Sequence, residues 1–280
     1  MNLTYLTLLR PAQWLKNMMV LFPVFLAGNA LQPGVASRAA LPFCAFCLVS
    51  SAGYIFNDLL DRKRDVLHPN KRQRAIASGA ASVLGASLYA AALLLSGFVL
   101  AGLYAPAIVL FLLAYAAVSL LYSSVLKSMP VVDLFSISAG FLIRLQAGGV
   151  LFQVPISPWL FLTVFLLAIF LSTGKRLSES HSLGEDAGEH RVSLAGYPAG
   201  FLAGTLYLTG SSVLVTYAMY SLMNAKLIYT VPLCLFGLLR YILRVTAGAS
   251  GDPTESLLKD RALLAVSLAW LLMVIWSIYR

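Results

Sequence analysis

Apolar runs of about 20 residues recur along the chain, and short segments that hold most of its charge separate them. A membrane-spanning helix needs about 20 mostly apolar residues, because each residue advances the helix by only about 1.5 Å. The pattern therefore predicts an all-α, polytopic membrane protein that forms a single domain over residues 1–280. The nine expected spans lie near 17–35, 39–57, 80–100, 104–122, 129–148, 156–173, 198–221, 227–244 and 262–279.

Composition agrees with this class, since 60% of the residues are hydrophobic and the mean hydropathy is +0.84. A soluble domain is nearer 45–50% apolar, even when glycine is counted. The N-terminal stretch MNLTYLTLLRPAQWLKN is short and polar, and no small-residue cleavage site follows a compact apolar core. We therefore expect no cleavable signal peptide.

The basic residues predict which side of the membrane each connection faces. Of the 20 Lys and Arg residues, all but four fall in the N-terminal segment, 57–79, 122–130, 173–197 and 240–261. The exceptions are Arg38, Arg144, Lys226 and Arg280. Because cytoplasmic connections are enriched in Lys and Arg, we expect a multi-pass protein of the cytoplasmic membrane whose five basic segments face the cytoplasm. The net charge of +9 then needs no nucleic-acid partner to explain it.

The acidic residues need a second explanation. All 11 Asp and Glu residues lie in the same basic segments or at the helix ends beside them, although the positive-inside rule makes no demand on carboxylates. Ion pairing or a metal–phosphate site would account for both signs of charge on one face. Cysteine and histidine offer no competing metal site: Cys44 and Cys47 lack a second pair, Cys234 is isolated, and no HExxH motif occurs.

The stretch NDLLDRKRDVLHPNKRQRAIASG, residues 57–79, concentrates this charge. If the second span continues as a helix, Asn57, Asp61 and Asp65 stack along one face at intervals of four residues. Magnesium usually binds one or two carboxylates together with substrate phosphates, so this face is a candidate magnesium site. An alternative is that Arg62, Lys63 and Arg64 pair with the aspartates on a solvated helix. Asp58 lies on a different part of the helix and is a weaker candidate.

The loop that follows is a candidate phosphate-binding segment. Pro69 is expected to end the helix, because proline cannot continue it. Lys71, Arg72 and Arg74 come next, and they suit a substrate that carries more than one phosphate.

The sequence NDLLDRKRD resembles the NDxxDxxxD signature of the UbiA prenyltransferase superfamily. The extension HPNKRQRAIASG is similar to the form found in the decaprenyl-phosphate phosphoribosyltransferases of that superfamily, with Ala75 where proline is usual. Four further stretches resemble that subgroup: RPAQWLKN (10–17), YSSVLKSMPVVDLFSISAGFLIRLQAGG (122–149), GKRLSE (174–179) and GDPTESLLKDR (251–261). The resemblance covers nearly the whole chain.

The resemblance implies nine helices around a central cavity, with magnesium, or manganese as an alternative, held by Asn57, Asp61 and Asp65. It also implies that Lys71 and Arg72 take part in catalysis. The residues expected to bind substrate are Gln13, Lys16, Asn17, Arg64, Arg74, Tyr122, Lys127, Arg144, Lys175, Arg176 and Glu179.

The second half of the chain departs from the aromatic prenyltransferases of the superfamily. Those enzymes carry a second aspartate-rich motif after the sixth span, where this chain has Lys175, Arg176 and, as the remaining carboxylate, Glu179. An arginine there favours direct hydrogen bonding to phosphate over metal-mediated binding. Alternatively, Lys175 and Arg176 are only positive-inside anchors. Arg144, three helical turns from Asp133, either binds a phosphate or pairs with a buried group.

The resemblance implies transfer of 5-phosphoribose from 5-phosphoribosyl 1-diphosphate to a polyprenyl (decaprenyl) phosphate, with release of diphosphate, in the synthesis of a cell-wall or glycan precursor. The acceptor phosphate is already anionic near neutral pH, so no general base is required. An aromatic prenyltransferase that uses a prenyl diphosphate is the nearest alternative. A transporter would place charges near the midplane, whereas here they gather at one face. The possibility of a homo-oligomer is left open.

Overall fold

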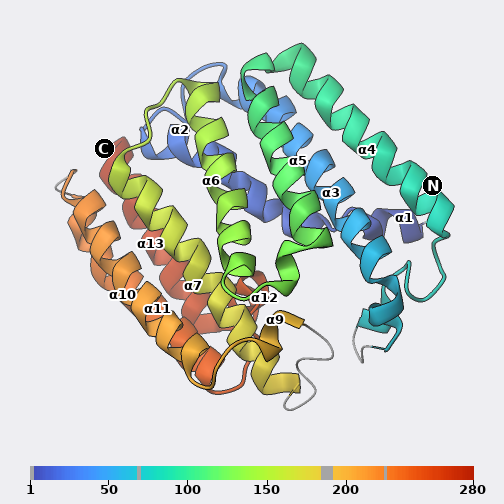
Figure 1. The fold of residues 1–280 in the computed structure, drawn as a ribbon. Helices are drawn as coiled ribbons and strands as arrows, with labels where there is room; N and C mark the ends of the chain where they lie inside the picture. Colours follow the sequence, from blue (N-terminus) through green and yellow to red (C-terminus); the bar gives the residue numbers. More distant parts are fainter. Residues whose placement is uncertain (1–2, 68–70, 184–191, 224–225) are drawn as a thin grey trace. The chain divides into compact units, whose positions relative to one another are not determined.

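Helices are the regular secondary structure of residues 3–67, 71–183, 192–223 and 226–280, which are the residues that this computed structural model describes (Figure 1). Eight helical segments in this part of the chain are long and apolar enough to cross a membrane. The polytopic all-α class predicted from the sequence is therefore confirmed. The chain divides into two compact units, unit 1 (Met1–Lys127 and Ile143–Pro155) and unit 2 (Ser128–Leu142 and Ile156–Arg280).

Unit 1 is built on the long helix α3, Val35–Leu67, which packs against α4, Val83–Tyr104, and α5, Val109–Ser124 (Figure 1). The C-terminal part of α6, Val132–Phe152, also belongs to this unit. Short 3-10 turns join these helices: η2 (Lys71–Gln73), η3 (Pro106–Ile108) and η4 (Leu126–Ser128). The core of this unit includes Phe46, Val49 and Leu112. Gly97 allows α4 to approach α3 closely, because a Cβ at this position would lie only 2.7 Å from Val49 Cγ2.

The first predicted span, 17–35, does not form one long helix. Its residues lie in the 3-10 helix η1, Pro11–Leu21, and the short α2, Phe22–Leu26, after α1, Leu3–Leu8. The apolar run is cut short by Gly28 and Gly34, both of which adopt positive φ angles of 76° and 82° that glycine tolerates at little cost. This accounts for eight membrane-length helices in the described residues where the sequence predicted nine.

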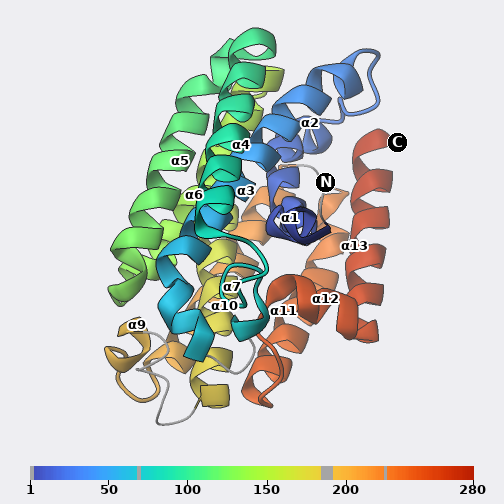
Figure 2. The same cartoon turned by 90° about the vertical axis from the view of Figure 1, so that its right-hand side faces the viewer.

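Unit 2 contains the longer helices α7 (Pro158–Leu183), α10 (Phe201–Ser221), α11 (Val231–Thr246) and α13 (Arg261–Tyr279). Figure 2 shows α11 beside α12 and α13 in this unit. Its short elements are α9 (Val192–Ala195), η6 (Leu227–Thr230) and α12 (Pro253–Lys259). The core packs Phe170 against Tyr241, with ring centroids 5.2 Å apart, and Leu206 is fully buried beside them. The prediction of a single domain stays a prediction.

Candidate active site

The polar end of α3 carries the densest group of carboxylates in unit 1. The helix continues without interruption to Leu67, which confirms that Asn57, Asp61 and Asp65 stand on successive turns. The predicted end of the helix at Pro69 lies outside the described residues. Backbone amides of the helix interior are already bonded within the helix, so compensation of these charges has to come from side chains.

Two arginines from distant segments bind the aspartates nearest the core. Arg10 Nη2 donates to both oxygens of Asp58, at 2.7 and 2.6 Å. Arg74 Nη1 donates to Asp58 Oδ1 at 2.9 Å and to Asp65 Oδ2 at 2.8 Å, so one guanidinium joins two turns of α3. Asp58 and Asp65 are each only 4% exposed. Burial strengthens such pairs, because little water competes for the same oxygens.

A lysine joins the other two polar groups of this face. Lys127 Nζ lies 2.6 Å from Asp61 Oδ1 and 3.4 Å from Asn57 Oδ1. The amide and carboxylate oxygens of two successive turns thus converge on one positive group. Lys127 belongs to η4, just after α5, and lies 66 residues from Asp61 in the sequence.

The alternative in which neighbouring cations neutralise the aspartates is not what the structure shows. Arg62, Lys63 and Arg64 are exposed, and none of the ion pairs among the described residues joins them to Asp58, Asp61 or Asp65. Arg62 lies four residues after Asp58 and Arg64 three residues after Asp61, yet these aspartates pair instead with Arg10, Arg74 and Lys127. The cluster of Arg10, Arg74, Lys127 and the four polar residues of α3 is called the acidic cluster below.

The donor set of the acidic cluster fits a metal ion that is shared with a phosphate substrate. Asn57 and Asp61 each direct a side-chain oxygen at the ammonium group of Lys127. No set of three His, Cys, Asp or Glu side chains within the described ranges is arranged to hold an ion without help. Magnesium commonly binds through one or two carboxylates and completes its coordination with water and substrate phosphates. Asp65 is directed instead at Arg74, and its role as a third metal ligand stays a prediction.

The N-terminal residues predicted to bind substrate form a second polar group in unit 1. Asn17 is fully buried and accepts a hydrogen bond from Arg144 Nε at 2.8 Å. Its amide nitrogen lies 3.1 Å from Ser50 Oγ, and the Arg144 guanidinium stacks on Tyr115 at 4.2 Å from the ring centroid. These contacts match the alternative in which Arg144 pairs with a buried group of the chain. Gln13 and Lys16 are half-buried in η1.

Unit 2 holds a separate buried network around Asp133. Arg176 Nε donates to Asp133 Oδ2 at 2.8 Å, and its Nη1 donates to Glu179 at 2.9 Å. The exposed fractions of the Arg176 and Asp133 side chains are 2% and 0%. Tyr197 donates to Asp133 Oδ1 at 2.6 Å, and burial, followed by this hydrogen bond, raises the pKa of its hydroxyl. Arg176 therefore has carboxylate partners of its own, and its predicted contact with phosphate stays a prediction.

The remaining predicted residues occupy varied positions. Lys71 is half-buried and Arg72 exposed in η2, which places both beside Arg74 in the sequence. Tyr122 is half-buried near the end of α5, and Lys175 pairs with Asp252 at 3.3 Å in unit 2.

Sequence reasoning missed Arg10 and underrated Asp58, although Arg10 contacts both carboxylate oxygens of Asp58. A signal for Arg10 was present, since it opens the motif RPAQWLKN.

Comparison with known proteins gives matches over nearly the whole chain. Residues 18–266 match the model of the UbiA prenyltransferase family. Decaprenyl-phosphate phosphoribosyltransferase of Mycolicibacterium smegmatis is 31% identical, over 94% of this chain and 88% of the relative. The protein of that name from Mycobacterium tuberculosis H37Rv is also 31% identical, over 94% of this chain and 90% of its own.

Among solved structures, a UbiA homolog from Archaeoglobus fulgidus bound to DMAPP and Mg²⁺ matches with a TM-score of 0.75 at 20% identity, and the match covers 99% of each chain. An apo UbiA homolog from Aeropyrum pernix K1 matches with a TM-score of 0.69 at 17% identity, over 93% of this chain and 97% of that one. At these identities the likeness concerns the fold.

Proposed function

Because this chain belongs to the UbiA prenyltransferase family, we propose that it is a membrane transferase that acts on a diphosphate donor at its acidic cluster. The donor we propose is 5-phosphoribosyl 1-diphosphate, and the acceptor is a polyprenyl phosphate. The bond between the anomeric carbon and the diphosphate oxygen breaks, and a bond from that carbon to an oxygen of the lipid phosphate forms. Diphosphate leaves with the electron pair of the broken bond.

One observation carries this proposal: three cations from separate segments converge on the polar face of α3 in unit 1. Arg10, Arg74 and Lys127 are all within 3 Å of an aspartate oxygen in this face. Such groups can hydrogen-bond to phosphate oxygens in place of carboxylates, and charge-assisted hydrogen bonds of this kind are about twice as strong as neutral ones. A donor with a diphosphate and a further phosphate supplies enough negative charge to use them.

The residues of the acidic cluster have different roles in the proposed reaction. Asn57 and Asp61, with Asp65 as the third predicted ligand, would hold magnesium, which would neutralise charge on the leaving diphosphate when bound. Arg74 is held by two aspartates and is therefore oriented before substrate arrives. Lys71 and Arg72, in the same segment, are the predicted partners of the 5-phosphate. The acceptor phosphate is an anionic nucleophile, so the reaction asks no side chain to remove a proton.

The choice of donor follows from the relatives and from unit 2. The relatives at 31% identity are named for a phosphoribosyl transfer to decaprenyl phosphate. In this chain Arg176 stands where aromatic prenyltransferases were expected to have a metal-binding carboxylate, and Arg176 is itself engaged by Asp133 and Glu179. We further place the acidic cluster at the cytoplasmic side, because Lys and Arg concentrate in its segments.

The test is a substrate comparison on the purified protein in detergent with magnesium. We expect product from phosphoribosyl diphosphate and a polyprenyl phosphate, and none from a prenyl diphosphate and an aromatic acceptor. The opposite pattern would assign the chain to the aromatic prenyltransferases of the family. Removal of magnesium with EDTA should stop the reaction, and added magnesium or manganese should restore it.

A further inference from the structure

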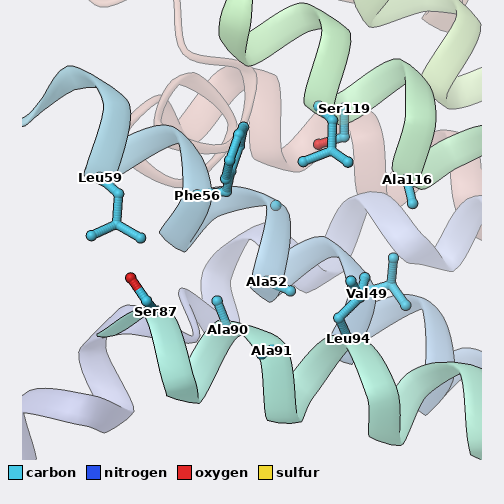
Figure 3. Close-up of a pocket in the computed structure, with 12 residues that line it drawn as sticks. Val49, Ala52, Phe56, Leu59, Ser87, Ala90, Ala91, Leu94, Ala116 and Ser119 are labelled. Carbon is cyan, nitrogen blue, oxygen red and sulfur yellow. The ribbon is translucent and has the colours of Figure 1, made fainter. Parts of the chain in front are cut away.

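Unit 1 contains a pocket on the side of α3 that faces away from the acidic cluster. It has a volume of about 230 Å³ and is lined by α3, α4 and α5 (Figure 3). From α3 come Val49, Ala52, Gly53, Phe56 and Leu59, and the other two helices supply mainly alanine and leucine. Ser87 and Ser119 are the polar residues of the lining, and the Ser87 hydroxyl is already bonded to Val83 O at 2.8 Å. The surface offered to an occupant is therefore hydrocarbon.

Helix geometry separates this pocket from the proposed site of phosphate chemistry. An α-helix turns about 100° per residue, so residues two apart point in nearly opposite directions. Leu59 lines the pocket, whereas Asp61, two residues later, belongs to the acidic cluster. The pocket residues Val49, Ala52, Phe56 and Leu59 recur at intervals of three and four, which defines one stripe of α3. The tail of a substrate bound at the aspartates would thus lie on the other side of the helix.

The same stripe ends in a cation. Lys63 is four residues beyond Leu59 and two residues from both Asp61 and Asp65, so it continues the pocket stripe and points away from the aspartates. Lys63 is exposed, and none of the ion pairs within the described part of the chain involves it. Figure 3 shows Leu59 and Ser87 at one end of the pocket, with Val49 and Leu94 toward the other.

The first turn of α4 brings further positive potential to that end. Ser87 stands one turn inside α4, whose first residue is Val83 and whose N-cap is Ser82. The N-terminus of an α-helix carries a partial positive charge that favours anions. Lys63 and the start of α4 therefore both favour a negative group at the end of the pocket that Leu59 and Ser87 mark.

We propose that this pocket binds one acyl chain of an anionic glycerophospholipid, with the phosphate at Lys63 and the first turn of α4. Helices α3 and α4, and the segment Pro106–Ser124 that contains η3 and α5, are of membrane-spanning length and composition, so bilayer lipid is the hydrocarbon available to them. A void lined by apolar atoms loses dispersion contacts until a chain fills it. A slot lined mainly by alanine and leucine side chains accepts a single flexible chain more readily than a partner helix. The site does not depend on the proposed transfer reaction.

Native mass spectrometry of delipidated protein tests the proposal with dioleoyl phosphatidylglycerol and dioleoyl phosphatidylcholine, which have the same chains and different head-group charge. Ala91 lines the pocket and its neighbour Ala92 does not, although both are exposed on α4. We expect Ala91→Phe to lose most binding of both lipids and Ala92→Phe to keep it. Equal binding by the two variants would overturn the site.

The head group is tested with a second matched pair. Wild type should prefer phosphatidylglycerol, and Lys63→Ala should reduce that preference by about fivefold, as expected for one lysine near an anionic surface. Arg62→Ala removes the same charge one residue away and should leave the preference unchanged. A preserved preference in Lys63→Ala contradicts the assignment of the phosphate.

Phosphatidylglycerol that carries a photo-crosslinking group on its acyl chain tests the site in the wild-type protein. This experiment therefore does not require any variant to fold. Crosslinks should fall on peptides that contain 87–94 or 116–120. Crosslinks spread evenly over the other membrane-length helices would overturn the proposal.

Discussion

At the scale of single residues, Asp58 is the side chain on which the acidic cluster depends. It accepts hydrogen bonds from Arg10 and Arg74, and it is 4% exposed while the two arginine side chains are 26% and 28% exposed. Removal of one partner from a buried ion pair leaves the other charge buried without compensation. The resulting loss of folding free energy exceeds the net stabilisation that the intact pair provides.

Asp58→Asn should therefore lower the free energy of unfolding by about 3 kcal/mol, at the low end for buried pairs because both arginines retain some contact with solvent. Thermal or denaturant unfolding in detergent measures this loss. The matched control is Glu255→Gln, whose partner Lys259 is 69% exposed, and which should change stability by less than about 1 kcal/mol. An Asp58 variant as stable as that control would show that the pair with Arg10 contributes little.

Asp61 should behave differently, since its role is proposed to be chemical. Asp61→Asn keeps the size of the side chain and its contact with Lys127 but removes the charge that would hold a metal. We expect activity to fall by on the order of a hundredfold, with little change in thermal unfolding, as for loss of a major electrostatic stabiliser. Steady-state rates over a magnesium titration measure this. Wild-type activity in the variant would make Asp61 a structural residue.

The residues of this site were partly predictable from sequence. The spacing of Asn57, Asp61 and Asp65 is local information, and the helix that aligns them is confirmed. The partners Arg10, Arg74 and Lys127 depend on which loops pack against α3, and two of them lie 48 and 66 residues away from the carboxylates they contact. The spacing of residues within a few helical turns cannot predict such contacts between distant segments.

At the scale of elements, the helix start at Asp260 is an electrostatic junction. Asp260 is the N-cap of α13 and accepts a hydrogen bond from Leu263 N, while Arg240 and Arg244 of α11 both donate to it. These contacts, the Arg240 hydrogen bond foremost, hold the pKa of the Asp260 carboxyl well below its ordinary value of 3.8.

A carboxylate whose pKa is lower in the folded state stabilises the fold above its unfolded pKa, and that contribution is lost as pH falls through the folded value. Stability should therefore decline below about pH 4. Asp260→Asn retains the helix cap, because asparagine caps as well as aspartate, but it loses the ionic contribution. The acid decline of the unfolding midpoint, followed from pH 7 to pH 3, should be shallower in this variant. An unchanged profile would remove Asp260 as a source of acid sensitivity.

The element that sequence reasoning placed least well was the first span. Hydropathy alone predicts a helix over 17–35, but the structure ends α2 at Leu26, and Gly28 and Gly34 take up positive φ angles. The remaining membrane-length helices lie where apolar runs predicted them, because long uninterrupted apolar segments leave the backbone no other way to satisfy its hydrogen bonds in lipid.

At the scale of the whole molecule, the distribution of charge predicts the orientation in the membrane. Single cysteines at Gln73, Thr246, Arg38 and Lys226, in a chain whose Cys44, Cys47 and Cys234 are replaced, report the side of each connection. An impermeant maleimide applied from the cytoplasmic side should label positions 73 and 246 and spare 38 and 226. Labelling of position 73 from the opposite side only would reverse the orientation and place the acidic cluster outside the cytoplasm.

The proposed reaction requires that a water-soluble sugar brings the diphosphate and that a lipid phosphate accepts the sugar. Phosphoribosyl diphosphate labelled with ¹⁴C in the ribose and ³²P in the diphosphate follows both halves of the donor in one assay with a polyprenyl phosphate. We expect ¹⁴C to move to the lipid phase while ³²P stays in the aqueous phase as released diphosphate, and Asp61→Asn to suppress both the transfer of ¹⁴C and the release of diphosphate. Failure of ¹⁴C to enter the lipid phase in the presence of magnesium, by a protein that does consume a prenyl diphosphate, would contradict the proposed transfer.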